Sequence, residues 1–205
     1  MGSPHPVPDE TKTVVRILDA AVRQIGAVGA AELSMSGVAR EAGVSKALIH
    51  YHFRDKDSLL ARVVSHLAQG LSQRERECLA RYETQHSPLA VDALWEWLAS
   101  ELERGYIRVL LELDAYRGPE VRAAARIAAD QRRDSARDTV ERLFRILDLI
   151  PRIESSLLAS VVVAFVDGIA LDVGLATETG GVSALPDSAR VAFDVFWLAM
   201  LSLAE

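Results

Sequence analysis

Cysteine is almost absent from this 205-residue sequence, since Cys78 is the only one. A single thiol excludes an intrachain disulfide and a zinc site built on cysteines, and it fits a reducing compartment. Proline is also scarce, with 7 residues, and no low-complexity tract occurs, which argues against extended disorder. Half of the residues are hydrophobic, so the chain can bury a substantial core.

Patterns typical of targeting and anchoring segments are not apparent in the sequence either. Residues 1–8 have no basic start followed by an apolar run, so we expect no secretory signal. The most apolar stretch, Leu157 to Val166, is too short to span a bilayer and is followed by Asp167 and Asp172, which predicts a buried helix. We therefore expect a cytoplasmic protein without membrane contact.

The net charge of −6 is unevenly divided along the chain. Residues 1–66 hold 8 lysines and arginines against 7 acidic residues, whereas the remainder holds 15 against 22. Because an acidic surface repels nucleic acid, any DNA contact is expected from the N-terminal part.

No segment alternates apolar and polar residues for long enough to predict a sheet. Apolar residues instead recur at spacings of three and four, as in amphipathic helices, and glycines and prolines separate these segments. We predict an all-α fold of about nine helices. Two short ones lie between Ser34 and Phe53, and the others cover residues 10–28, 57–82, 88–103, 105–116, 119–147, 153–176 and 186–204.

The two short helical patterns are joined by Gly43-Val44. Ser34 and Ser45 are suited to cap the two helices, and Gly43 permits the positive φ of a tight helix-ending turn. Four apolar residues can face inward and hold these helices against the first one: Val38, Val44, Ile49 and Phe53. The pattern predicts a helix-turn-helix whose second helix enters the major groove of DNA.

The side chains left on the outside of this motif suit contacts with DNA. Lysine can reach phosphate or a guanine edge, alanine and leucine can touch a thymine methyl group, and imidazole can donate to phosphate. We expect DNA contacts from Ser34, Ser36, Ser45, Lys46, Ala47, Leu48, His50, His52 and Lys56. A metal site at the two histidines is not expected, because a two-residue spacing puts them on different helix faces.

At these residues the sequence resembles the tetracycline-repressor (TetR) family of bacterial regulators. The resemblance is carried by Ser34, Val38-Ala39, Ala42-Gly43-Val44-Ser45, Ile49-His50, His52-Phe53 and Lys56. Two positions depart from the family pattern: Ala47 replaces a frequent glycine, and His50 replaces a tyrosine that contacts a phosphate in the family. An imidazole can still donate a hydrogen bond there. Lys56 matches the family's second phosphate contact.

The resemblance implies a function and a division of the chain. It implies a homodimeric transcriptional regulator, expected to be a repressor, that binds a palindromic double-stranded operator and is released by a small-molecule effector. We expect a flexible N-terminus over residues 1–9, a DNA-binding domain over 10–56, and a ligand-binding and dimerisation domain over 57–205. No enzymatic activity and no cofactor are expected.

The last two predicted helices are apolar on nearly all sides. Such helices must be buried by more than their own core, either within a large monomer or between two copies. A single short recognition helix also buries too little surface for operator affinity, which favours a dimer. The expected interface residues are Leu157, Val161, Phe165, Gly168, Val191, Val195 and Leu198.

An effector site is expected where aromatic and polar residues interrupt the apolar stripes of the middle helices. The candidates are Trp95, Leu98, Tyr106, Leu110, Glu112, Leu113, Tyr116, Arg133, Phe144, Phe165 and Asp167, with Val162 and Trp197 as further apolar positions. Most such residues belong to the core in an ordinary helical protein.

Two other functions remain open from the residues alone. A helical enzyme could use Glu101, Glu112 or Asp167 as acid or base, but no nucleophile–base pair, phosphate loop or metal spacing accompanies them. A scaffold that binds only protein would leave the helix-turn-helix without a role.

Overall fold

The computed structural model describes residues 10–83, 87–178 and 185–205, and these form nine helices and no strand. The all-α fold predicted from the sequence is confirmed. The expectation of a flexible N-terminus over residues 1–9 lies outside the described residues.

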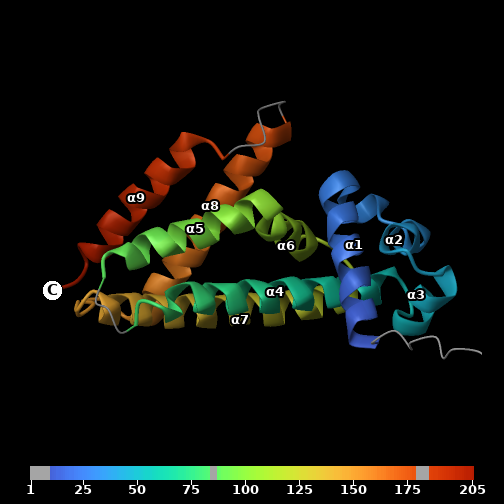
Figure 1. The fold of residues 1–205 in the computed structure, drawn as a ribbon, viewed down its shortest axis with the longest axis horizontal. Helices are drawn as coiled ribbons and strands as arrows, with labels where there is room; N and C mark the ends of the chain where they lie inside the picture. The colour runs from blue at the N-terminus through green and yellow to red at the C-terminus, as the bar shows by residue number, and fades with distance from the viewer. Residues whose placement is uncertain (1–9, 84–86, 179–184) are drawn as a thin grey trace, which may run out of the picture.

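The helices follow one another with short connections (Figure 1). Their bounds differ from the predicted ones by at most three residues, except at the end of the first helix. They are α1 (Glu10–Glu32), α2 (Met35–Ala42), α3 (Lys46–His52), α4 (Lys56–Ala80), α5 (Leu89–Arg104), α6 (Tyr106–Asp114), α7 (Pro119–Ile146), α8 (Ser155–Glu178) and α9 (Asp187–Leu201).

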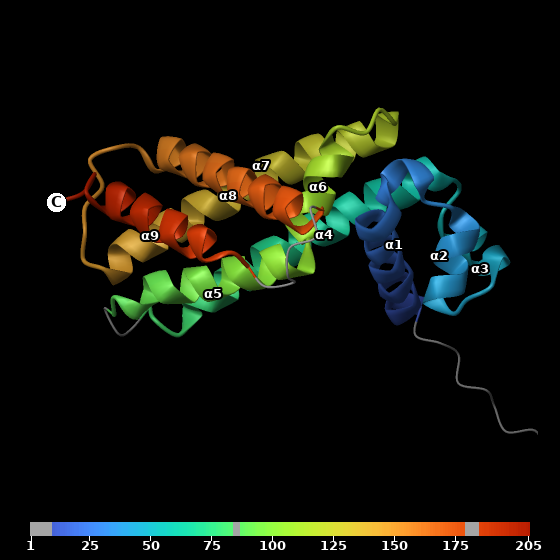
Figure 2. The same cartoon turned by 90° about the horizontal axis from the view of Figure 1, so that it is seen from above.

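Helices α1, α2 and α3 gather at one end of the molecule, and α4 leads from them into a larger helical body (Figures 1 and 2). Helix α4 runs beside α7 in the same direction: Asp57 lies next to Glu120 at the start of both helices, and Glu75 lies next to Ser135 further along. We refer to residues 10–52 as the head and to α4 to α9 as the body.

Helix α1 is interrupted near its end. Gly29 has φ 85° and ψ 157°, a conformation essentially restricted to glycine, and one more helical turn follows as far as Glu32. The predicted end of the helix near Gly26 and Gly29 is therefore a break in α1, after which the chain forms one more helical turn. The resumed turn buries Ala30, and Leu33 just beyond it, in the core.

The break removes helical partners from nearby backbone groups, and side chains of α6 replace them. The carbonyl of Gly26 accepts a hydrogen bond from Arg108 Nη2 at 3.0 Å. The amide of Ala30 donates to Glu112 Oε1. In a continuous helix these two groups would bond to one another, so the two bonds replace that contact and connect the end of α1 in the head to α6 in the body.

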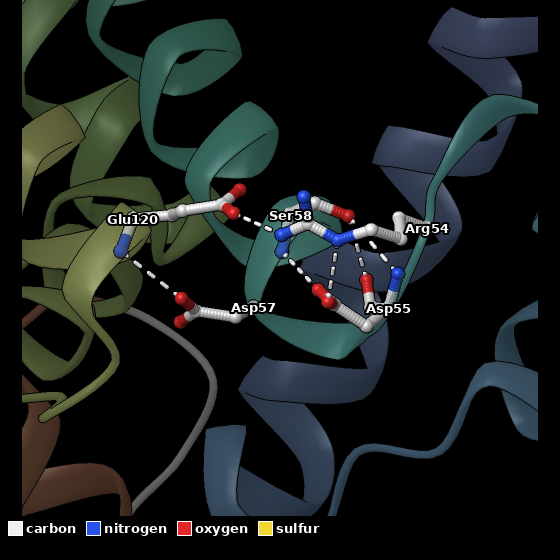
Figure 3. A network of polar contacts seen from close by, with 5 residues as sticks. All are labelled: Arg54, Asp55, Asp57, Ser58 and Glu120. Atoms are coloured by element: carbon white, nitrogen blue, oxygen red, sulfur yellow. Dashed lines mark hydrogen bonds and ion pairs between the residues drawn. The ribbon is translucent and has the colours of Figure 1, made fainter.

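A second connection joins the start of α4 to the start of α7 (Figure 3). The amide of Ser58 donates to Asp55 Oδ1 at 2.9 Å, which caps α4, and this bond and the Arg54 guanidinium lower the pKa of the Asp55 carboxyl. The amide of Glu120 donates to Asp57 Oδ2 at 3.0 Å, and Arg54 reaches the Glu120 carboxylate. The first turns of the two longest body helices are thus fixed together.

Helix α8 differs from its sequence-based interpretation. Its segment Ser155–Leu175 is long and apolar enough to cross a membrane by length and composition. The stretch Leu157 to Val166, which is too short by itself to span a bilayer, is therefore part of a longer apolar helix. A helix buried in a soluble protein passes the same test. Asp167 lies in the middle of this helix and pairs with Arg132 of α7, which fits a helix packed against protein.

Gly29→Ala is expected to destabilise the fold by about 1–3 kcal/mol, because a Cβ is strained at this positive φ and would stand 3.3 Å from Glu112 Oε1. Urea unfolding measures the change. The matched control is Gly26→Ala in the same helix, where the nearest atom to an added Cβ is 3.9 Å away. That variant should be neutral or more stable by up to about 1 kcal/mol, and equal losses in both variants would contradict the assignment of strain.

Candidate functional site

The helix-turn-helix forms with the caps that the sequence predicts. Ser34 Oγ accepts from the amide of Gly37 at 3.1 Å, and Ser45 Oγ accepts from the amide of Leu48 at 3.1 Å. Gly43 has φ 62° and ends α2 in the left-handed conformation. Because both ends of the turn are fixed locally, the angle between α2 and α3 is set by this short segment.

Helix α3 has one buried and one exposed face. Val38 and Ile49 have no exposed surface and Phe53 is 2% exposed, so these residues pack into the core as predicted, while Val44 is half-buried. The opposite face is open to solvent. Its exposed residues are Ser45, Lys46, Ala47 and His50, with Leu48 half-buried beside them, and Ser34 and Ser36 are exposed at the start of α2.

Tyr51 also belongs to this exposed face, and the sequence analysis missed it. Its side chain is 73% exposed, and its ring lies edge-on to His52 with centroids 5.0 Å apart. Its phenolic hydroxyl can donate to a phosphate. The helical spacing could have predicted its exposure: Ile49 and Phe53 face inward four residues apart, so the residues directly after Ile49 must point outward.

Two predicted DNA-contact residues have other neighbours in this structure. His52 is half-buried and lines a hollow between α1 and α4, away from the face that carries Lys46. Lys56 Nζ donates to the carbonyl of Ala31 at 2.6 Å and so holds the start of α4 against the turn after the break in α1. An ammonium group has three donors, so Lys56 keeps the capacity to bind a phosphate as well.

The predicted effector residues do not form one site. Leu98, Leu113 and Phe144 are fully buried core residues, because they point between packed helices. Glu112 is exposed and accepts a hydrogen bond from the amide of Ala30, so its carboxylate contacts the end of α1.

The aromatic candidates are also dispersed. Trp95 packs against Phe193 between α5 and α9, and Tyr106 lies under the guanidinium of Arg74. Phe165 stacks on Phe196 at 3.9 Å between α8 and α9. Tyr116 is half-buried at the turn after α6, Val162 lines a separate cavity, and Trp197 lies in the core.

Three of the predicted residues do meet. Leu110, Arg133 and Asp167 line a hollow of about 210 Å³ among α4, α6, α7 and α8. Arg132 shares this hollow and pairs with Asp167. The side chain of Arg133 is directed to Asp130 on its own helix.

A smaller cavity of about 40 Å³ lies among α4, α5, α6, α7 and α8. Its polar wall consists of Ser72, Glu75, Trp97 and Arg132, and aliphatic residues form the rest. The sequence analysis named only Val162 among its lining residues. Glu75 could have been found because it interrupts the apolar series Leu67, Leu71 and Leu79 at a spacing of four.

Glu75 is the buried ionisable group of this cavity. Burial raises the pKa of its carboxyl group, while the hydroxyls of Ser135 and Thr139 and the charge of Arg132 oppose this shift in part. The hydroxyl of Ser135 donates to Glu75 Oε2 at 2.5 Å. Within the three described ranges, no basic side chain makes an ion pair with Glu75.

The carboxylates considered for an enzyme lie apart and have structural partners. Glu101 is 1% exposed and receives two hydrogen bonds from Arg74. Asp167 pairs with Arg132 of the neighbouring helix. Burial raises the pKa of the Cys78 thiol to about 12, so it stays protonated and is a poor nucleophile at neutral pH.

The outer faces of α8 and α9 expose large apolar side chains. The residues are Leu157, Val161, Leu171, Leu175, Val191, Val195 and Leu198, with exposed fractions between 44% and 73%. The two helices lie next to one another on the same side of the body (Figures 1 and 2). A Cβ added at Gly168 would meet no other atom of the described residues within 4 Å, so α8 is open at this position. An apolar surface of this extent is typical of a protein interface.

Comparisons with known proteins find a family match in the N-terminal part of the chain and similarity to transcriptional regulators over most of its length. Residues 17–63 match the family model described as "Bacterial regulatory proteins, tetR family". The HTH-type transcriptional regulator BetI of Brucella anthropi is 29% identical over 155 residues, which cover 75% of this chain and 77% of that protein.

Solved structures share the fold. A transcriptional regulator from Rhodococcus sp. Rha1 superposes with a TM-score of 0.71 at 21% identity, covering 93% of this chain and 97% of that one. The SmeT–triclosan complex superposes with a TM-score of 0.65 at 21% identity, covering 92% and 91%.

A capped helix-turn-helix with an exposed second helix, joined to a helical body, defines a DNA-binding transcriptional regulator, and the curated relatives are regulators and not enzymes. Residues 17–63 of the chain match the TetR family of bacterial regulatory proteins, and three quarters of the chain is similar to the regulator BetI. The resemblance identified at Ser34 to Lys56 is thereby confirmed.

Glu75→Gln is expected to stabilise the free protein at neutral pH and to do so less as the pH falls. The folded state of the parent holds the Glu75 proton more tightly than the unfolded state, so the parent loses stability as the pH rises from the ordinary glutamate range toward the raised pKa. Glutamine does not titrate and can still accept from Ser135.

Urea unfolding at several pH values checks this expectation. Glu77→Gln, two residues away and exposed on the same helix, is the matched control and should follow the parent at each pH. A parent that gains stability relative to Glu75→Gln with rising pH would show that the buried carboxyl is stabilised in its charged form.

Proposed function

We propose that the chain binds a palindromic operator as a homodimer, represses transcription there, and leaves the DNA when a small-molecule effector enters the body. The proposal assigns DNA binding to residues 10–56, and effector binding and dimerisation to residues 57–205. It places the protein in the cytoplasm, where the DNA is. The SmeT–triclosan complex, a regulator with a small molecule bound, is compatible with an effector-binding body.

One observation carries the DNA-binding part of the proposal. The inner face of α3 packs into the core through Ile49, while Lys46, Ala47, His50 and Tyr51 are exposed together on its outer face. A short helix held rigidly at its base and presenting lysine, imidazole and phenol groups fits the major groove and its flanking phosphates.

The exposed apolar face of α8 and α9 supports the dimer. Helix α9 and the start of α8 lie at the end of the body away from α1 to α3, so pairing of two such faces would leave both α3 helices free for DNA (Figure 1). A two-fold interface uses the same patch on both copies, and a palindrome has matching symmetry.

The contacts between α6 and α1 support a route from effector to DNA. Ile107 of α6 lines the small cavity, and the next residue, Arg108, donates to Gly26 at the end of α1. A ligand that displaces α6 would change the position of the head, and therefore the spacing of two heads in a dimer. Glu112, one turn further along α6, holds the resumed turn of α1.

Lys46→Ala is expected to weaken operator binding by about tenfold or more, because an exposed cation at the start of α3 is removed. The slope of log affinity against log salt concentration should fall by about one, which corresponds to the loss of one phosphate contact. Gel shifts at several salt concentrations, on a palindrome selected from random duplexes, measure both quantities. Arg152→Ala, an exposed cation at the opposite end of the molecule, is the control and should bind like the parent. Binding without sequence preference, or equal binding by Lys46→Ala, would refute the proposal.

Leu198→Glu is expected to convert the dimer to a monomer, because it places a charge on the most exposed apolar side chain of the α8–α9 face, at 73% exposure. Light scattering gives the mass in solution. Val28→Glu puts the same charge on an exposed apolar residue of the head and should leave the dimer intact. A monomeric parent, or a Leu198→Glu variant that stays dimeric, would exclude this interface.

A further inference from the structure

We infer that the cavity bounded by Ser72, Glu75 and Trp97 takes a small organic cation, an amine with an apolar body whose ammonium group pairs with the Glu75 carboxylate. The inference deepens the proposed function, on which it rests for the role of that ligand as the effector. The binding site itself is argued from the residues of the cavity.

The charge balance of the cavity wall favours a cation. Three charged groups lie there or directly behind it: Glu75, Arg132 and Asp167. Both terminal nitrogens of Arg132 are directed to Asp167, one of them at 3.4 Å, so these two charges compensate one another. The Glu75 carboxyl accepts a hydrogen bond from Ser135 but makes no ion pair among the described residues, and the charge of Arg132 offsets its burial only in part.

Desolvation explains why the missing counter-charge matters. A carboxylate that is buried without an opposite charge is costly, and the raised pKa of Glu75 reflects this cost. A ligand ammonium supplies the opposite charge and allows Glu75 to ionise inside the cavity. An anion or a neutral ligand supplies no opposite charge and would leave the neutral form of Glu75 favoured.

The remaining wall indicates the rest of the ligand. Aliphatic side chains of α4, α6, α7 and α8 line the cavity, among them Leu71, Ile107 and Val162, which suits a hydrocarbon body. Two polar atoms of the wall have no hydrogen-bond partner within the described part of the chain: Ser72 Oγ, in a residue 8% exposed, and the buried Nε1 of Trp97. The indole N–H can only donate, so it can bind an acceptor atom on the ligand.

The size of the cavity limits the first ligands to test. A volume of about 40 Å³ holds a few water molecules and suits a short alkyl amine, whereas a cavity that takes benzene measures about 150 Å³, so a ring amine must extend into neighbouring space. The neighbouring hollow of about 210 Å³ shares Arg132 and Val163 with it. A longer amine would reach that hollow by moving Arg132 away from Asp167.

Calorimetry on the full chain without DNA tests the inference. The probes are three amines, propylamine, cyclohexylamine and benzylamine, and the alcohols of the same shape, 1-propanol, cyclohexanol and benzyl alcohol. Each pair has the same body and differs in charge at neutral pH. For at least one pair we expect the amine to bind about tenfold tighter than its alcohol or better.

Substitutions of Glu75 test whether its carboxylate causes the preference for the amine over the alcohol. In Glu75→Gln, which keeps the size and the hydrogen bond from Ser135, the amine and the alcohol should bind within about threefold of one another. Glu75→Asp keeps the charge and should keep the preference for the amine. Glu77→Gln removes an equal charge from the exposed side of α4 and should bind like the parent.

The inference is overturned if neither series binds, if the alcohols bind as tightly as the amines, or if Glu75→Gln keeps the amine preference. Because no DNA is present, a failure of operator binding leaves these readouts unchanged and affects only the proposed function. A gel shift with the tightest amine then tests its role as effector: release of the parent but not of Glu75→Gln supports that role, and no release of either refutes it.

Discussion

The interruption of α1 at Gly29 is the constraint on which the relation between head and body depends. A continuous helix would satisfy its own backbone groups, but at the break the carbonyl of Gly26 and the amide of Ala30 need other partners. Arg108 and Glu112 of α6 provide them. A local feature of one glycine therefore makes the position of the DNA-contact helices depend on a helix of the body.

The same helix connects the head to the buried cavity. Ile107 faces the cavity and Arg108 faces α1, so two adjacent residues of α6 contact the two regions that a ligand-responsive regulator must couple. Helix α8 supports this arrangement at Gly174, where an added Cβ would lie 3.0 Å from Arg108 Cδ. Small movements of α6 relative to α8 would therefore change the position of the end of α1.

Glu75 illustrates a conflict between stability and function. An apolar side chain at this position would continue the buried face of α4, whereas the carboxyl group costs free energy when it is buried without a counter-charge. Natural proteins depart from the rules for stable cores chiefly at functional sites. The departure here coincides with two unpartnered polar groups, Ser72 Oγ and Trp97 Nε1, on the wall of the same cavity.

Local chemistry made the head predictable from the sequence: serine caps, a glycine turn and inward residues four positions apart act within a few residues of one another, and the helix bounds follow from similar local signals. The effector candidates could not be sorted in this way. Whether Phe144 or Glu112 faces a cavity depends on which helices lie beside it, and Leu98 has the same helical periodicity whether it packs in the core or lines a pocket. Only the packing of α4, α5, α7 and α8 together brought Glu75, Trp97 and Arg132 to one cavity, because their contacts join residues far apart in the chain.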